Sequence, residues 1–159
     1  MVVQVTNAQR EVPVDVGRMT RVARRAVRRL RIRTHGTLSI TFIDSQRIRT
    51  VNRQFLRHDR TTDVLSFRYD GQLKGPQRQI VGEILIAPRQ AKRYAAAHKI
   101  SYVEELSRYV VHGLLHWLGH DDQTTVQQRK MRMMEDRLLA SCGVRSESHV
   151  SCLMSPVSS

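Results

Sequence analysis

Apolar positions along the chain recur with two spacings, and these spacings predict the order of the secondary-structure elements. Alternating or continuous apolar runs predict four strands, in "VVQVT", "GTLSITFID", "TDVLSFRYD" and "QIVGEILIAP". Apolar residues at steps of three and four predict helices in residues 15–32, 45–56, 89–98, 102–118 and about 124–140. The order β-α-β-α-β-β-α-α-α predicts an α/β or α+β fold, in which a small, mostly parallel four-stranded sheet packs with about five helices.

Two of these helices are long and strongly patterned. The helix over residues 102–118 is expected to be buried, and Gly119 is its natural end. The last helix is expected to bury one apolar face, made of Val126, Met133, Met134 and Leu138.

The composition changes at Ser141. Residues 1–141 are expected to form a single domain, and residues 142–159 a Ser-rich C-terminal tail without fixed structure. Cys142 and Cys152 have no CxxC spacing, so they say little about a disulfide or a metal site.

Charge is the most unusual bulk property of the 159-residue chain. It carries 27 Lys and Arg against 14 Asp and Glu, a formal net charge of +13. A domain this basic usually meets a polyanion, most often nucleic acid, although a genomic preference for Arg accounts for part of the excess. No segment is apolar enough to span a membrane and the N-terminus resembles no secretory signal, so a cytoplasmic protein is expected.

The stretch "HGLLHWLGHDD" has the features of a metal site. His112 and His116 are four residues apart on the predicted helix and therefore project from one face. After the turn at Gly119, a third ligand can come from His120, Asp121 or Asp122. A pair of ordinary core histidines is the alternative, but the helix-ending Gly and the run of ligand-type side chains favour a metal.

The type of metal chemistry is narrowed by the same residues. A protease of the HExxH kind needs a glutamate directly after the first histidine, where this chain has Gly113. Three protein ligands leave one position open, which is typical of a catalytic site, and one Zn²⁺ ion is the best match to two imidazoles and a third N or O donor.

Three motifs resemble the YbeY-type endoribonucleases, the rRNA maturation factors. "VVHGLLHWLGHDD" is similar to that family's H-G-x-L-H-L-x-G-Y-D-H. "VNRQFLRHDRTTDVLSF" is similar to its N-x-x-[FY]-x-x-x-D-x-x-T-[DN]-V-L-S-F, and "VGEILIAPRQAKRYA" to its G-[DE]-[IL]-x-I segment and following helix. The motifs stand in the same order as in the family and cover about residues 51–122.

The resemblance implies one zinc held by three side chains and hydrolysis of single-stranded RNA. It also implies a role in 16S rRNA 3′-end maturation and ribosome quality control, with the small ribosomal subunit as partner. The family's third ligand falls on Asp122, which we favour over its rival His120 because no gap is needed. The family's Arg after the aromatic residue is replaced by Leu56, and Arg57 follows it as a candidate catalytic residue.

Other residues receive roles on this hypothesis. Glu83 is a candidate proton-transfer carboxylate or an ordinary strand residue, Asp63 is expected to be a turn residue or cap, and the direction of Ser66 stays open. RNA phosphates are expected to meet six arginines, Arg18, Arg21, Arg25, Arg28, Arg53 and Arg60. The competing functions are a non-catalytic ribosome-assembly factor with a structural zinc and a metal hydrolase with a non-nucleic substrate.

Overall fold

The computed structural model describes residues 1–56, 62–69, 71, 75 and 79–144. Its elements are β1 (Val2–Asn7), α1 (Val16–Arg29), β2 (Thr37–Phe42), α2 (Ser45–Leu56), β3 (Val64–Arg68), β4 (Ile80–Ile86), α3 (Pro88–His98), α4 (Tyr102–Trp117) and α5 (Thr125–Ser141). The four strands form one sheet in the order β1-β2-β4-β3. Only the β3–β4 pair is antiparallel, so the prediction of a mostly parallel four-stranded sheet with five helices is confirmed.

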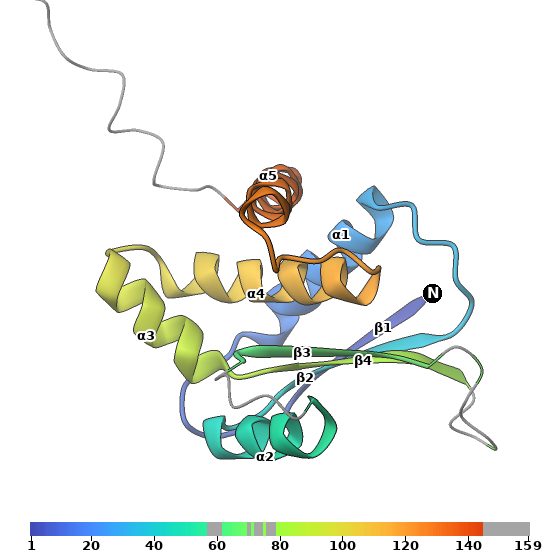
Figure 1. Ribbon diagram of the computed structural model, residues 1–159, viewed down its shortest axis with the longest axis horizontal. Coiled ribbons are helices and arrows are strands. Elements are labelled where there is room, and N and C mark those ends of the chain that lie inside the picture. The colour runs from blue at the N-terminus through green and yellow to red at the C-terminus, as the bar shows by residue number, and fades with distance from the viewer. Residues whose placement is uncertain (57–61, 70, 72–74, 76–78, 145–159) are drawn as a thin grey trace, which may run out of the picture.

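The sheet separates two layers of unequal size (Figure 1). On one face, α1, α4 and α5 pack over a large core that contains Ile40, Ile84, Val110 and Leu114. On the other face, α2 covers a small cluster around Leu65 and Leu85. Helix α4 contacts strands β3 and β4 as well as α1, α3 and α5, so the helix that carries both histidines is the centre of the larger layer.

Local sequence signals set where the helices begin. The Asp15 side chain accepts a hydrogen bond from the backbone N–H of Arg18, and Ser101 caps α4 in the same way through Glu104. Thr124 and Gln127 form a reciprocal capping box at the start of α5. The end of α4 is set by Gly119, whose φ of +94° is a conformation that glycine adopts without strain and that turns the chain back.

The predicted face of α5 was right for Leu138, which is buried, and for Met134, which packs against the core, but wrong for Val126 and Met133. Val126 is 76% exposed and Met133 is 56% exposed, whereas Met131, Leu138 and Leu139 are buried. The buried stripe also contains Glu135, an acid that a hydrophobic pattern does not select. Glu135 hydrogen-bonds to Arg108 and His112 on α4, and these contacts make its burial tolerable.

The core continues past the expected domain limit at residue 141. Cys142 and Val144 are buried against it, and Cys142 is a free thiol. Burial raises the pKa of this thiol. The rest of the Ser-rich tail, including Cys152, lies outside the described residues. No helix in the described part of the chain combines the length and the apolar character needed to cross a membrane.

Candidate metal centre

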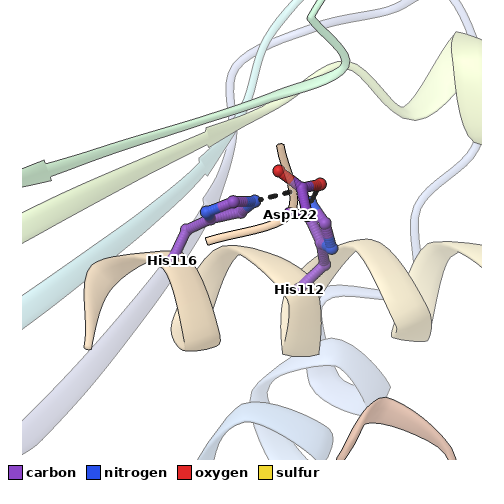
Figure 2. Close-up of side chains that lie close together, drawn as sticks. All are labelled: His112, His116 and Asp122. Carbon is purple, nitrogen blue, oxygen red and sulfur yellow. Dashed lines mark ion pairs between the residues drawn. The ribbon is translucent and has the colours of Figure 1, made fainter. Parts of the chain in front are cut away.

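Helix α4 brings two imidazoles to one face, as residues four apart on a helix require. The ring centres of His112 and His116 are 4.4 Å apart, and the planes are inclined by 78°. Their side chains are 26% and 28% exposed, so both rings are partly accessible to a ligand in solution. Figure 2 shows the two rings rising from the helix toward a third side chain, Asp122.

Asp122 completes the group because the chain turns back after Gly119. Its Oδ2 atom is 3.7 Å from Nε2 of His112 and 3.5 Å from Nε2 of His116. Ligand atoms about 2.1 Å from one tetrahedral zinc ion are about 3.4 Å apart, so the two separations between Asp122 and the histidines are close to the spacing that a shared ion needs. These three residues could hold a metal ion. Across the described segments, no other set of three His, Cys, Asp or Glu side chains converges as closely.

His120 lies elsewhere. Its backbone N–H donates to the carbonyl of Leu115, which fixes the turn after α4. Its side chain lines a separate hollow of about 210 Å³, beside Lys130 and Met134. The turn therefore brings Asp122, and not His120, to the two imidazoles.

A buried carboxylate supports one of the imidazoles from behind. Nδ1 of His112 is 2.8 Å from Oε1 of Glu135, which is 6% exposed on α5. The other carboxylate oxygen of Glu135 accepts a hydrogen bond from Nη1 of Arg108 at 3.0 Å. The same Arg108 atom is 2.8 Å from Oδ1 of Asp136. Sequence analysis missed Glu135, although an acid between Met131 and Leu138 in the stripe at steps of three and four was a usable signal.

The histidines open into a cleft of about 820 Å³ that also contains Asp63, Tyr109 and Arg132. The Tyr109 hydroxyl donates to Oδ2 of Asp63 at 3.1 Å. Asp63 also caps the neighbouring strand end, because its backbone carbonyl accepts from the N–H of Ala87. The expectation of a turn residue is thus incomplete, since the Asp63 carboxyl faces the same cleft as the histidines.

Burial sets the protonation of two groups in the cleft. It lowers the pKa of His116, and the neighbouring His112 lowers it further, while Asp122 and a backbone hydrogen bond with His120 oppose the shift; the net effect favours the neutral imidazole. Burial raises the pKa of Asp63, although the Tyr109 hydrogen bond and the charge of His112 oppose the change. Asp63 therefore holds a proton more readily than an ordinary aspartate.

Register places Glu83 away from this cleft. Glu83 stands opposite Phe67 in the β3–β4 pair, on the face that Leu65 and Leu85 direct toward α2. Its carboxylate accepts a hydrogen bond from the Tyr69 hydroxyl at 3.2 Å. Ser66 points to the α4 side, where its Oγ donates to the carbonyl of Gly113 at 2.9 Å. The structure therefore brings Ser66, and not Glu83, close to the histidines.

The six predicted RNA-binding arginines are dispersed. Arg18, Arg21, Arg25 and Arg28 are exposed on α1, in the same layer as α4, whereas Arg53 is exposed on α2, on the opposite face of the sheet. Arg25 also donates to the carbonyl of Cys142 at 2.9 Å and so joins α1 to the end of α5. Arg60 and the candidate catalytic residue Arg57 lie outside the described residues.

The fold and the site together define the class of protein. It is an α+β domain with a candidate His-His-Asp metal centre at the end of its central helix. A sequence profile described as "Endoribonuclease YbeY" matches residues 4–143. The chain is 37% identical over 112 residues to a Myxococcus xanthus protein named endoribonuclease YbeY, which covers 70% of this chain but only 38% of that longer protein. It is 34% identical over 145 residues to the protein of the same name from Pelotomaculum thermopropionicum, covering 87% of this chain and 95% of the relative.

The fold has a counterpart among solved structures. A Thermotoga maritima protein whose structure was determined in solution matches with a TM-score of 0.55 and 18% identity, over 87% of this chain and 90% of the other.

The chain belongs to the endoribonuclease YbeY family. Membership supports an RNA-cleaving, hydrolytic function and RNA as the substrate class.

Proposed function

We propose that this protein is a single-strand-specific, zinc-dependent endoribonuclease that acts in 16S rRNA 3′-end maturation and ribosome quality control, in the cytoplasm and on the small ribosomal subunit. The observation that carries the proposal is the convergence of His112, His116 and Asp122 in an open cleft, in a chain of an endoribonuclease family. The ribosomal setting rests on the resemblance of the three sequence motifs alone.

His112, His116 and Asp122 are the proposed ligands of one Zn²⁺ ion. Two imidazoles and a carboxylate are a donor set that zinc accepts, and three ligands keep a fourth position open to the cleft. When bound, the ion supplies an activated water near neutral pH and positive charge against the scissile phosphate. The lowered pKa of His116 favours its unprotonated form, which weakens the competition of protons with the metal for this ligand.

Asp63 is the proposed proton-transfer group of the cleft. Its carboxyl faces the same space as the two histidines, and the Tyr109 hydroxyl fixes its Oδ2 atom. A carboxyl with a raised pKa can hold and release a proton closer to neutral pH than an ordinary aspartate. Glu83 has no part in this scheme because it lies on the α2 face of the sheet.

RNA recognition is proposed to be electrostatic. The exposed arginines of α1 lie on the α4 side of the sheet, and phosphate contacts of this kind are strongly salt-dependent. Arg53 on α2 also belongs to the proposed RNA contacts, together with Arg60; both assignments, like that of the candidate catalytic residue Arg57, come from the sequence alone. With an aromatic content of 5%, the chain offers few platforms for base stacking, so low sequence specificity follows.

The test is cleavage of an end-labelled single-stranded RNA by the wild type and by His116→Ala, purified in parallel, with and without added Zn²⁺. His120→Ala is the matched control, since it removes an imidazole of the same motif that faces another hollow. The proposal expects cleavage by the wild type and His120→Ala, a loss of at least about 100-fold in His116→Ala, and little cleavage of a duplex of the same sequence.

The alternatives predict other results. A non-catalytic assembly factor binds rRNA in a salt-dependent manner, cleaves nothing, and keeps its RNA affinity in His116→Ala. A hydrolase with a non-nucleic substrate shows no competition by RNA. Equal cleavage by the wild type and His116→Ala would identify a contaminating nuclease and overturn the proposal.

A further inference from the structure

We infer that Glu135 is a positioning residue of the metal centre, which holds His112 in the one tautomer and orientation that can bind the metal. The inference rests on the metal site of the proposed function. Glu135 belongs to α5, lies outside the three sequence motifs and is not itself one of the three proposed metal ligands.

The two nitrogens of His112 have different partners. Nδ1 is 2.8 Å from Oε1 of Glu135, and Nε2 is 3.7 Å from Oδ2 of Asp122, on the side of the ligand group. A carboxylate only accepts hydrogen bonds, so Nδ1 carries the proton and donates it to Glu135. The lone pair is then on Nε2, which is the atom that faces Asp122 and His116.

The Glu135 carboxylate is itself held in place. It is 6% exposed, and its Oε2 atom accepts a hydrogen bond from Nη1 of Arg108 at 3.0 Å. Burial alone would lower the pKa of Arg108, but the hydrogen bonds of Asp136 and Glu135 outweigh it, and the guanidinium stays charged. Arg108 and His112 are four residues apart on α4, so one turn of this helix presents both partners to the two oxygens of Glu135.

This arrangement connects the packing of α5 to the metal. Glu135 and Asp136 belong to α5, whereas Arg108 and His112 belong to α4, and the contacts that dock the helices also orient the ligand. A hydrogen bond from the remote nitrogen of a ligand histidine to a carboxylate fixes the ring and makes it a better donor, and losing such a partner typically costs about 10–100-fold in metal affinity. If Glu135 had only a packing role, its replacement would change the stability of the fold without a specific loss of metal affinity.

Glu135→Gln tests the role with a side chain of the same shape. An amide has one oxygen and one NH₂ group, whereas both His112 Nδ1–H and Arg108 require an acceptor. The glutamine can therefore satisfy only one of the two donors, and it loses the charge as well. Asp136→Asn is the matched control, because it makes the same chemical change on the same helix and at the same Arg108 atom, whereas the carboxylates paired with His112 are those of Glu135 and Asp122.

The experiment uses the full chain of the wild type, Glu135→Gln and Asp136→Asn, without RNA. Zn²⁺ affinity is measured by competition with a chromophoric chelator, and the coordination geometry by the visible absorption of the Co²⁺-loaded proteins. Circular dichroism and thermal unfolding of the metal-free proteins report the cost to the fold. We expect a loss of about 10–100-fold in Zn²⁺ affinity and a changed Co²⁺ spectrum for Glu135→Gln, and less than about threefold for Asp136→Asn.

Wild-type affinity in Glu135→Gln, or an equal loss in both variants, would overturn the inference. Failure of Glu135→Gln to fold does not end the test, because Arg108→Lys replaces the Nη1–H that donates to Oε2 of Glu135 from the far side, and is expected to weaken Zn²⁺ binding in the same direction. Since no RNA is present, a selective loss in Glu135→Gln upholds the inference even if the protein cleaves no RNA. If the wild type cleaves RNA but Glu135→Gln binds Zn²⁺ as tightly as the wild type, the proposed function stands and the inference about Glu135 fails.

Discussion

The Oγ atom of Ser66 donates a hydrogen bond to the backbone carbonyl of Gly113 over 2.9 Å, which joins β3 to α4 directly beside His112. The approach is so close because Gly113 has no side chain. A Cβ atom there would lie 2.6 Å from Cγ2 of Ile84 and 3.0 Å from Cγ1 of Val64. This is the position at which a protease of the HExxH type carries its glutamate, and here the sheet occupies the space that such a side chain needs.

Gly113→Ala is therefore expected to destabilise the protein. Alanine in a helix interior normally gains about 1 kcal/mol over glycine, but overpacking a core costs about 1–3 kcal/mol, and Ile84 is fully buried. We expect a net loss of up to about 2 kcal/mol, which corresponds to a fall of several degrees in Tm. Gly17→Ala is the control, because its Cβ meets atoms only at 3.5 and 3.6 Å, ordinary contacts, so Tm should hold or rise. Equal behaviour of the two variants in thermal unfolding would contradict the argument.

Asp122→Ala is expected to lower Zn²⁺ affinity by more than about 100-fold, because it removes one of three proposed ligands. Asp122→His should retain most of the affinity, since an imidazole can replace a carboxylate on zinc at a similar distance. His120→Ala should bind Zn²⁺ within about threefold of the wild type, because its side chain faces another hollow. Equilibrium dialysis with metal analysis measures all three, and a large loss in His120→Ala would reverse the assignment of the third ligand.

Asp63→Asn is expected to stabilise the protein at pH 7 and to reduce RNA cleavage. Burial raises the pKa of Asp63 above its ordinary 3.8, so the folded state binds this proton more tightly than the unfolded state does. The stability from this group is complete below pH 3.8 and is lost as pH rises through the raised pKa. Asparagine cannot ionise, and its oxygen can still accept from Tyr109.

The gain in Tm of Asp63→Asn over the wild type should therefore be largest at neutral pH and should shrink as pH falls toward 3.8. Thermal unfolding of both proteins between pH 7 and 4 measures this difference. Tyr109→Phe is the opposite control, because it removes a hydrogen bond that favours the ionised form and should destabilise the protein at pH 7. A Tm difference that does not change with pH would refute the protonation argument.

Replacing Arg18, Arg21 and Arg28 by Ala is expected to weaken binding of single-stranded RNA and to reduce its salt dependence. Each phosphate contact contributes about 0.7 to the slope of log K against log salt concentration for single strands, so three lost contacts lower the slope by about 2. Replacing Arg47 and Arg49 on α2, neither of which is assigned to RNA, removes charge from the opposite face and should have a smaller effect per arginine. Fluorescence anisotropy at several salt concentrations distinguishes the two surfaces, and equal effects would mean that only net charge matters.

Local sequence was enough to predict the order of the elements and two of the three proposed metal ligands, and the spacing of the motif already favoured Asp122 as the third. Hydrophobic spacing and helix caps act within a few residues, which is why the strands and helices were predicted in their observed order. The pairing of His112 and His116 follows from helical geometry alone. The motifs around both residues were also sufficient to identify the family.

The tertiary structure decided everything that depends on which face meets which neighbour. The turn after Gly119 brings Asp122 rather than His120 to the two imidazoles, and the β3–β4 register turns Glu83 toward α2. Glu135 was not predicted, because an acid is normally expected on an exposed face, whereas here it is buried and accepts hydrogen bonds from Arg108 and His112. Sequence spacing determines what lies within one element, whereas the packing of α4 against α5 and the sheet determines which polar groups share a site.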